Sequence, residues 1–298
     1  MDIPELSEYY MLKRKERFDA GIPLKGIKLR KLIHPFPYFL VKLDRVLKKR
    51  NFELINDDRI KTNRPVIYAC THIGGDDVQA AFEGIKKHAY LFMGDPKGAY
   101  KDEGGLLVFM NGVIILETKN KDDRRIAKIR ATELLNRRAD LAMYPEGAWN
   151  LSPNLLVMGL YLGLVQIARA TGADIVPVGI EQYDNDFVVS IGKNISMEET
   201  KNMSEQELNL YLRDCMATEK WRIIESRGIN NRKDINTTID DFETEIINRC
   251  PYEFTVEDMK NDRFHDKDVV EEKEVFNHLK KLNINSKNAF LINKRNHN

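Results

Sequence analysis

The stretch "VIYACTHIGGDDVQAAFEGIKKH", residues 66–88, decides the fold class. Its first five residues form the apolar run that is typical of a strand buried on both faces of a parallel sheet. The part from residue 76 onward has the texture of a helix, which we expect over roughly 76–87. A strand that passes through a glycine-containing loop into a helix indicates a crossover connection.

The same alternation continues as far as residue 191. Further strands are expected at 89–93, 112–116, 141–145, 175–180 and 187–191, and further helices at 122–138 and 154–171. Strands separated by helices of this length predict an α/β fold with a mostly parallel central sheet flanked by helices.

The pattern also predicts the ends of one helix and an irregularity in one strand. Ser152 can cap the helix over 154–171, with Pro153 in its first turn and Gly172 at its end. Pro177 interrupts an otherwise central-looking strand, which favours an edge position or an irregular backbone that lines a cavity.

The two ends of the chain differ from its middle. Residues 1–60 are expected to form a basic amphipathic helical segment, 61–195 the α/β core, and 196–298 a helical extension that begins with the capping box of Ser204 and Glu207. The first fifty residues hold 13 Lys/Arg against 6 Asp/Glu. Apolar residues recur at helical spacing between these lysines, at Phe39, Leu40, Leu43, Val46 and Leu47. This stripe can pack on the core or lie in the interface of an anionic membrane, and the two are compatible, because the helices can dock on one side and touch lipid on the other.

Composition narrows the class of protein. Hydrophobic residues make up 42% and charged residues 31% of 298, an ordinary soluble balance. The three cysteines are odd in number and lack metal-ligand spacing, which favours reduced thiols and a cytosolic protein. No secretory signal and no run of about 18 apolar residues is evident. We therefore expect a cytoplasmic protein that meets a membrane, if at all, from its surface.

His72 and Asp77 form the first candidate site. His72 follows a predicted strand, and Asp77 falls in the first turn of the helix after it. Ligands bind beyond the carboxyl ends of strands in open α/β sheets. A carboxylate bonded to one imidazole nitrogen leaves the other as a general base, with the substrate's own hydroxyl or amine as nucleophile.

The stretch "MYPEGAWN", residues 143–150, forms the second candidate site. Glu146 could position an acceptor group, and Gly147 could present its backbone N–H to an oxyanion. Taken alone, this stretch is more typical of a turn that ends a strand and carries a capping acid.

In order, these blocks resemble the glycerolipid acyltransferases, the lysophosphatidic acid acyltransferases and their relatives. The H-x-x-x-x-D motif corresponds to 72–77, G-x-I-x-I to 112–116, F-P-E-G to 144–147 and V-P-V to 176–178. The resemblance covers roughly residues 60–192. It implies transfer of a fatty acyl group from a coenzyme A or acyl-carrier-protein thioester, without a cofactor, a metal ion or an acyl-enzyme. His72 would deprotonate the acceptor and Asp77 would orient His72.

The chain departs from the family where the acceptor is bound. Thr118, Trp149 and Tyr161 replace the three cations that contact phosphate in glycerophosphate-type relatives. Arginine forks and lysines are what a phosphate monoester requires. We therefore expect a hydroxyl or amine of a lipid-like or glycan-like acceptor, with Trp149 or Tyr161 offering a flat face to a ring. Lys119, Arg124 or Lys97 could compensate for the missing cations, which keeps a lysophosphatidic acid acyltransferase open.

Three other classes of protein remain as alternatives. A scaffold with the acyltransferase fold and no activity would explain the missing cations. A metal-dependent hydrolase would use His72, Asp76 and Asp77 as ligands, but no second ligand cluster follows. A nucleic-acid binder is disfavoured because the N-terminal aromatic residues share one helical stripe and no recognised motif accompanies them.

Overall fold

We analysed a computed structural model of the chain, which describes residues 12, 16, 24–74, 77–94, 108, 110–118, 120–147, 149–150, 156–183 and 186–227. A sheet of seven strands in the order β1-β7-β6-β2-β5-β3-β4 forms its middle layer. The strands are β1 (Asn51–Asp57), β2 (Val66–Cys70), β3 (Tyr90–Gly94), β4 (Val113–Leu116), β5 (Leu141–Met143), β6 (Asp174–Tyr183) and β7 (Asp186–Ile191). The strands from β6 to β4 are parallel, whereas β7 is antiparallel to β6 and β1 is parallel to β7. The predicted mostly parallel α/β fold is confirmed.

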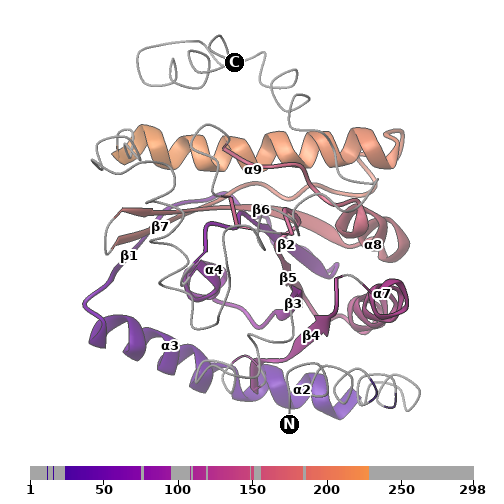
Figure 1. The fold of residues 1–298 in the computed structure, drawn as a ribbon, viewed down its shortest axis with the longest axis horizontal. Helices are drawn as coiled ribbons and strands as arrows, with labels where there is room; N and C mark the ends of the chain where they lie inside the picture. The colour runs from indigo at the N-terminus through magenta and orange to yellow at the C-terminus, as the bar shows by residue number, and fades with distance from the viewer. Residues whose placement is uncertain are drawn as a thin grey trace.

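Helices cover both faces of the sheet, so that the sheet forms the middle layer in Figure 1. One face carries α7 (Lys121–Asn136), α8 (Gly163–Thr171) and α9 (Glu205–Arg227). The other face carries α4 (Asp77–Ile85). Helix α3 (Pro35–Leu47) packs on the outside of α4. Helix α2 (Leu24–Ile33) precedes α3 along the chain. All five residues of β2 are buried because both faces of this strand are covered. Ile67 and Ala69 belong to one core cluster, and Tyr68 and Cys70 belong to the other.

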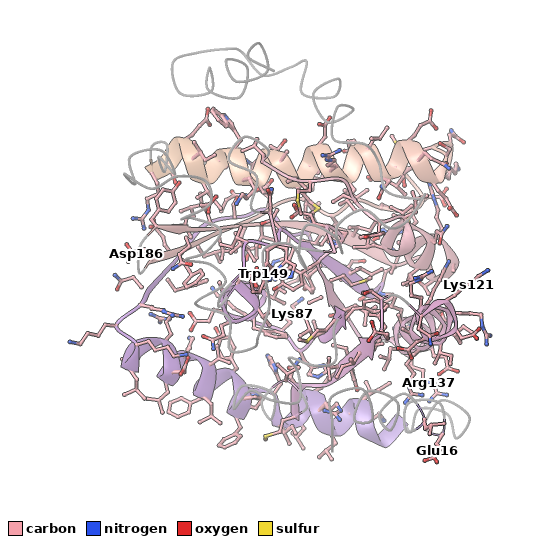
Figure 2. The ribbon with its side chains drawn as sticks, viewed as in Figure 1. Glu16, Lys87, Lys121, Arg137, Trp149 and Asp186 are labelled. Atoms are coloured by element: carbon pink, nitrogen blue, oxygen red, sulfur yellow. The ribbon has the colours of Figure 1, made fainter. Side chains whose placement is uncertain are left out.

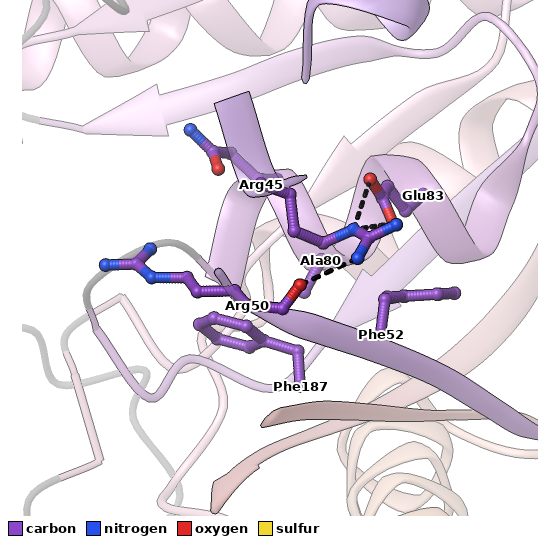
Figure 3. Close-up of a pocket in the computed structure, with 7 residues that line it drawn as sticks. Arg45, Arg50, Phe52, Ala80, Glu83 and Phe187 are labelled. Carbon is purple, nitrogen blue, oxygen red and sulfur yellow. Dashed lines mark hydrogen bonds and ion pairs between the residues drawn. The ribbon is translucent and has the colours of Figure 1, made fainter. Parts of the chain in front are cut away.

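The N-terminal helices are attached to α4 by a buried ion pair. Arg45 of α3 donates from Nε to both carboxylate oxygens of Glu83, at 3.0 and 2.9 Å, and from Nη1 to the carbonyl of Arg50 (Figure 3). Glu83 is 2% exposed. Because a buried carboxylate without a partner is costly, this pair fixes α3 against the helix that begins at Asp77.

The apolar stripe of α3 faces away from the core. In α3 it is Pro37 and Val41 that are buried, while Phe39 is 60% and Leu47 73% exposed. The interpretation in which the stripe packs on the core is therefore wrong. The exposed large apolar side chains of α2 and α3 are Leu29, Leu32, Phe36, Phe39, Leu43, Val46 and Leu47. We call these residues the apolar face.

Strand β1 was not predicted from the sequence and lies inside the range expected to be helical. The strand "NFELIND" is half-buried and pairs with β7 at the edge of the sheet, with an irregular register between Leu54 and Asn56. Short polar edge strands lack the apolar run that marks a central strand, so their signal is weak.

Pro177 is not in an edge strand, because β6 lies between β2 and β7. The pairing with β7 ends at Val178, one residue after the proline, and the Pro177 carbonyl then accepts from the Gly192 N–H on that side. The N–H that proline lacks would also point to that side, so β2 loses no hydrogen bond.

The helix expected over 154–171 begins later than predicted. Helix α8 starts at Gly163 and ends as expected at Gly172, which has the left-handed φ of 66°. Residues 156–162 form an extended loop, and Ser152 and Pro153 lie outside the described residues. The capping box at the start of α9 is confirmed by reciprocal hydrogen bonds between Ser204 and Glu207. The chain beyond 227 also lies outside the described residues.

Candidate active site

His72 and Asp77 lie in hydrogen-bond contact at the carboxyl end of β2. Asp77 Oδ2 is 2.8 Å from His72 Nδ1, and it also accepts the backbone N–H groups of Ile73 at 2.8 Å and Gly74 at 2.9 Å. Gly74 allows this tight turn with a φ of 87°. Because an ionised carboxylate only accepts hydrogen bonds, His72 carries its proton on Nδ1, which leaves Nε2 as the basic nitrogen.

Burial separates the two members of the pair. The Asp77 side chain is 1% exposed, at the first turn of α4, where the helix dipole favours a negative charge. The His72 side chain is 20% exposed. The structure thus combines a fixed, buried carboxylate with an imidazole that solvent or a substrate can reach.

Glu146 holds the backbone at His72. One carboxylate oxygen accepts the N–H of His72 at 2.9 Å, and the other accepts the N–H of Met158 at 2.8 Å. Glu146 is 2% exposed, and burial raises the pKa of its carboxyl while the two backbone donors oppose that rise. Both oxygens face the protein, so the acceptor-positioning role expected for Glu146 is replaced by one of supporting the His72 loop.

The backbone carbonyl of His72 is held as well. The His72 carbonyl accepts the N–H of Asn150 at 2.6 Å, and the Asn150 side chain donates to the carbonyl of Leu156. The turn after β5 therefore fixes both backbone groups of His72. Sequence reasoning missed Asn150, because an asparagine three residues after a glycine gives no sign of a partner 78 positions away.

Two aromatic rings flank the imidazole. The Tyr144 ring centroid lies 4.5 Å from that of His72, and the Trp149 centroid lies 6.3 Å away in an edge-on arrangement. Trp149 lies near α4 in the view of Figure 2. Trp149 therefore lies beside His72, while its role in binding the acceptor stays a prediction. Tyr144 belongs to a predicted motif but was not predicted as a site residue.

Tyr161 packs directly on Gly147. A Cβ atom at Gly147 would lie 2.2 Å from the Tyr161 ring, and Gly147 has a φ of 69°. The Tyr161 N–H donates to the Pro145 carbonyl at 2.8 Å. The Gly147 N–H donates to the Tyr144 carbonyl at 3.0 Å, so it is engaged in the turn. The oxyanion role expected for this N–H is incompatible with that bond, and the glycine instead makes room for Tyr161.

The candidates after β4 lie farther away. Thr118 is exposed beside Gly94 at the end of β3, and two strands separate β4 from β2. Arg124 donates to the Thr118 carbonyl. Lys119 and Lys97 lie outside the described residues. The structure thus brings His72, Asp77, Glu146, Trp149 and the stacked Gly147–Tyr161 pair to one end of the sheet and leaves Thr118 at its edge.

Helix α9 also holds the 156–162 loop, through two buried side chains. Arg213, 1% exposed, donates to the Val157 carbonyl from Nε at 3.2 Å and from Nη2 at 3.0 Å. Asn209 donates to the Leu160 carbonyl at 3.0 Å. These bonds explain why the loop is not helical, because side chains distant in sequence occupy its carbonyls.

Among the described residues, no group of three or more His, Cys, Asp or Glu side chains could hold a metal ion. None of the helices described is long and apolar enough to cross a membrane.

Comparisons with known proteins agree with this fold. Residues 51–181 match the family model described as Acyltransferase. The crystal structure of the 1-acyl-sn-glycerophosphate (LPA) acyltransferase PlsC from Thermotoga maritima is similar, with a TM-score of 0.54 and 17% sequence identity over 74% of this chain and 90% of that chain. No curated protein matches the chain. The resemblance inferred from the motifs is confirmed: residues 51–181 match the Acyltransferase model, and the chain shares the fold of the PlsC acyltransferase.

Proposed function

We propose that this protein transfers a fatty acyl group from an acyl-CoA or acyl-carrier-protein thioester to a hydroxyl or amine of a lipid-like or glycan-like acceptor. The observation that carries the proposal is the 2.8 Å bond between His72 Nδ1 and the buried Asp77 carboxylate. An oriented imidazole with a free basic nitrogen is what a direct transfer to a weakly acidic acceptor needs.

In the proposed reaction His72 acts first as a base and then as an acid. Nε2 removes the proton of the acceptor while its oxygen or nitrogen attacks the thioester carbonyl carbon. The tetrahedral intermediate collapses, the C–S bond breaks, and the leaving thiolate takes from Nε2 the proton that the acceptor had given up. Asp77 stabilises the imidazolium between these steps. No cofactor or metal ion has a part in these steps, since the thioester supplies the driving force.

The surroundings of His72 support an acceptor other than a phosphate monoester. The flanking groups in the described part of the site are the rings of Tyr144 and Trp149, with Tyr161 stacked on Gly147. Aromatic faces bind the apolar face of a sugar or a similar ring, whereas a phosphate requires arginine forks or lysines. Thr118 follows β4, which two strands separate from β2, and we assign the recognition of the acceptor at His72 to Trp149 and Tyr161.

We further propose that the apolar face binds an anionic membrane surface from the cytoplasmic side. Seven large apolar side chains project from α2 and α3, and Lys28, Lys31, Lys42, Lys48 and Lys49 are exposed on the same two helices and just after them. Apolar side chains next to lysines are the pattern of helices that lie in the bilayer interface. A lipid substrate would reach the enzyme from that surface.

An acceptor screen with a radiolabelled acyl thioester tests the proposed activity, with His72→Ala as the blank. The screen compares lysophosphatidic acid with neutral hydroxylated, amine-bearing and glycosylated lipids. We expect transfer to one of the uncharged or amine-bearing classes, abolished in His72→Ala. Preferred acylation of lysophosphatidic acid would contradict the proposed acceptor class, and transfer that survives in His72→Ala would contradict the mechanism.

A further inference from the structure

A pocket of about 250 Å³ lies at the end of the sheet opposite His72. Val66, the first residue of β2, and Asp140, which directly precedes β5, both line it, whereas His72 follows the last residue of β2. Pockets that hold a drug-sized ligand measure roughly 300–1,000 Å³. This pocket therefore suits a smaller molecule, and the proposed reaction gives it no part.

The wall of the pocket is fixed by Arg59. Its guanidinium donates to both carboxylate oxygens of Asp57, each at 2.6 Å, and to the Ile85 carbonyl at 2.8 Å. Its Cζ atom also lies 5.9 Å from the centroid of the buried Tyr68 ring. Arg59 and Asp57 thus neutralise each other, and Tyr68 gives the pocket an aromatic surface that is held in place.

Two lysines at the pocket lack an ion-pair partner. The charged side chains that line it are four cations and two carboxylates, namely Arg59, Lys61, Arg64, Lys87, Asp57 and Asp140. Arg64 Nε lies 2.9 Å from a carboxylate oxygen of the buried Asp174. Lys61 and Lys87 are exposed, and neither has an ion pair or a hydrogen bond with the part of the chain that the structure describes. Because Asp57 balances Arg59 and Asp174 balances Arg64, these two lysines face Asp140 alone.

Asp140 distinguishes this pocket from a plain anion site. One of its carboxylate oxygens accepts the Val66 N–H at 2.9 Å. Burial raises the pKa of its carboxyl, while that N–H and the charges of Lys31 and Lys87 lower it. A carboxylate repels a phosphate, but it accepts a hydrogen bond from a hydroxyl group. The lining thus favours a ligand that carries a phosphate in one part and a hydroxyl in another.

We propose that this pocket binds a small phosphate monoester that bears a hydroxyl group. The phosphate lies on Lys61 and Lys87, beside the exposed side of Arg64, and the hydroxyl donates to Asp140. Lysine and arginine are the side chains that bind phosphate in proteins. The groups that flank His72 in the described part of the site are aromatic, so this ligand does not compete with the acceptor.

Isothermal titration calorimetry of the full chain with glycerol 2-phosphate, without an acyl donor, tests the proposal independently of the proposed function. We expect saturable binding at one site. In the pocket variant, Lys61→Gln combined with Lys87→Gln, Kd rises about tenfold or more, because two charge-assisted contacts are lost. Methyl phosphate, which lacks the hydroxyl, binds the parent about fivefold more weakly, the worth of one hydrogen bond. Equal affinity for the two esters would overturn the role of Asp140.

Lys121→Gln combined with Lys201→Gln is the matched control. Both lysines are exposed and lie outside the pocket, at the start of α7 and before α9, and the variant loses the same charge. We expect the affinity of the parent. The thermal midpoint without ligand stays at the parent value in the pocket variant, because neither lysine has a partner to lose. The absence of saturable binding by the parent, or equal weakening in the control, would overturn the proposal.

Flotation separates a lipid headgroup from a soluble ester as the source of the phosphate. Phosphatidylinositol 4-phosphate offers a monoester with ring hydroxyls, whereas phosphatidylinositol offers the hydroxyls alone. A preference of the parent for vesicles with the phosphorylated lipid, lost in the pocket variant and kept in the control, identifies a headgroup. Equal binding to both kinds of vesicle, with the calorimetric result unchanged, identifies a soluble ester.

Discussion

At the residue scale, a substitution of Asp77 tests whether His72 and Asp77 act together in the proposed reaction. Asp77→Asn keeps the size of the side chain and removes its charge, so the imidazolium loses its stabilisation and the preferred tautomer is no longer enforced. We expect kcat to fall by roughly 10³-fold with little change in either KM. Steady-state kinetics check this, with Asp122→Asn as the control, because Asp122 is an exposed acid in the first turn of α7. A fall confined to KM would contradict the orienting role.

Glu146 gives a second prediction at this scale. Two backbone N–H groups point at its carboxylate, and a glutamine can accept only one of them. In Glu146→Gln the amide NH₂ therefore faces an N–H, leaving a buried donor unpaired at a cost of about 1–3 kcal/mol. We expect a lower thermal midpoint and a lower kcat with an unchanged acceptor KM. Glu198→Gln, at an exposed position, is the control. A raised acceptor KM alone would return Glu146 to the acceptor site.

The residues at the centre of the site were predictable because their partners lie close in sequence. His72 and Asp77 are five positions apart, across one strand–helix turn. Glu146 was found, yet its partners were not, because Met158 and the His72 backbone come from other elements. A phenol in place of the family's phenylalanine was the visible signal at Tyr144, but only the folded chain places its ring against His72.

At the scale of elements, His34 and His88 join the N-terminal helices to the core and should make this attachment sensitive to acid. Both rings are buried, 5.6 Å apart between centroids, and each has one buried ring nitrogen without a hydrogen-bond partner in the described part of the chain. Burial lowers the pKa of His34 and lowers that of His88 to about 4, and the cations Arg30 and Lys31 also act on His88.

The sign of the effect follows from these directions. Between about pH 4 and 6.5 the unfolded chain binds protons that folded His88 refuses, so the free energy of unfolding is complete above pH 6.5 and falls as pH drops toward 4. The loss due to His88 is about 3 kcal/mol at most. Urea unfolding at pH 7.5, 5.5 and 4.5 measures it, and His88→Gln should flatten the dependence because glutamine can still donate to the Asn111 carbonyl. An equally steep dependence in that variant would contradict the assignment.

Elements with a strong apolar pattern were predicted within a few residues, while those fixed by distant partners were not. β2 and the start of α9 agree with expectation. The sequence did not predict β1, because an edge strand needs no apolar run. It predicted a helix over residues 156–162, because the pattern there is apolar on all sides. Hydrogen bonds from Glu146, Asn209 and Arg213 decide that the loop is extended. Such bonds leave no periodic trace in the sequence.

At the scale of the whole molecule, the basic N-terminal helices and the His72–Asp77 pair are parts of one scaffold. α3 is fixed to α4 by Arg45 and Glu83, and α4 begins at Asp77. Figure 1 shows α2 and α3 on the side of the molecule opposite α9. A membrane bound at the apolar face would therefore be held at a fixed position relative to His72.

The apolar face gives the last prediction. Phe39→Ser combined with Leu47→Ser removes two exposed side chains from it, and burial of each in lipid contributes about 1.5–3 kcal/mol. We expect binding to vesicles of 70% phosphatidylcholine and 30% phosphatidylglycerol to weaken at least a hundredfold in flotation assays, while acyl transfer to a short-chain, micellar acceptor is unchanged. Ile60→Ser is the matched control, since Ile60 is 54% exposed but lies on the connection between β1 and β2. Equal weakening in the control, or full vesicle binding by the double variant, would mean that membrane association does not depend on this face.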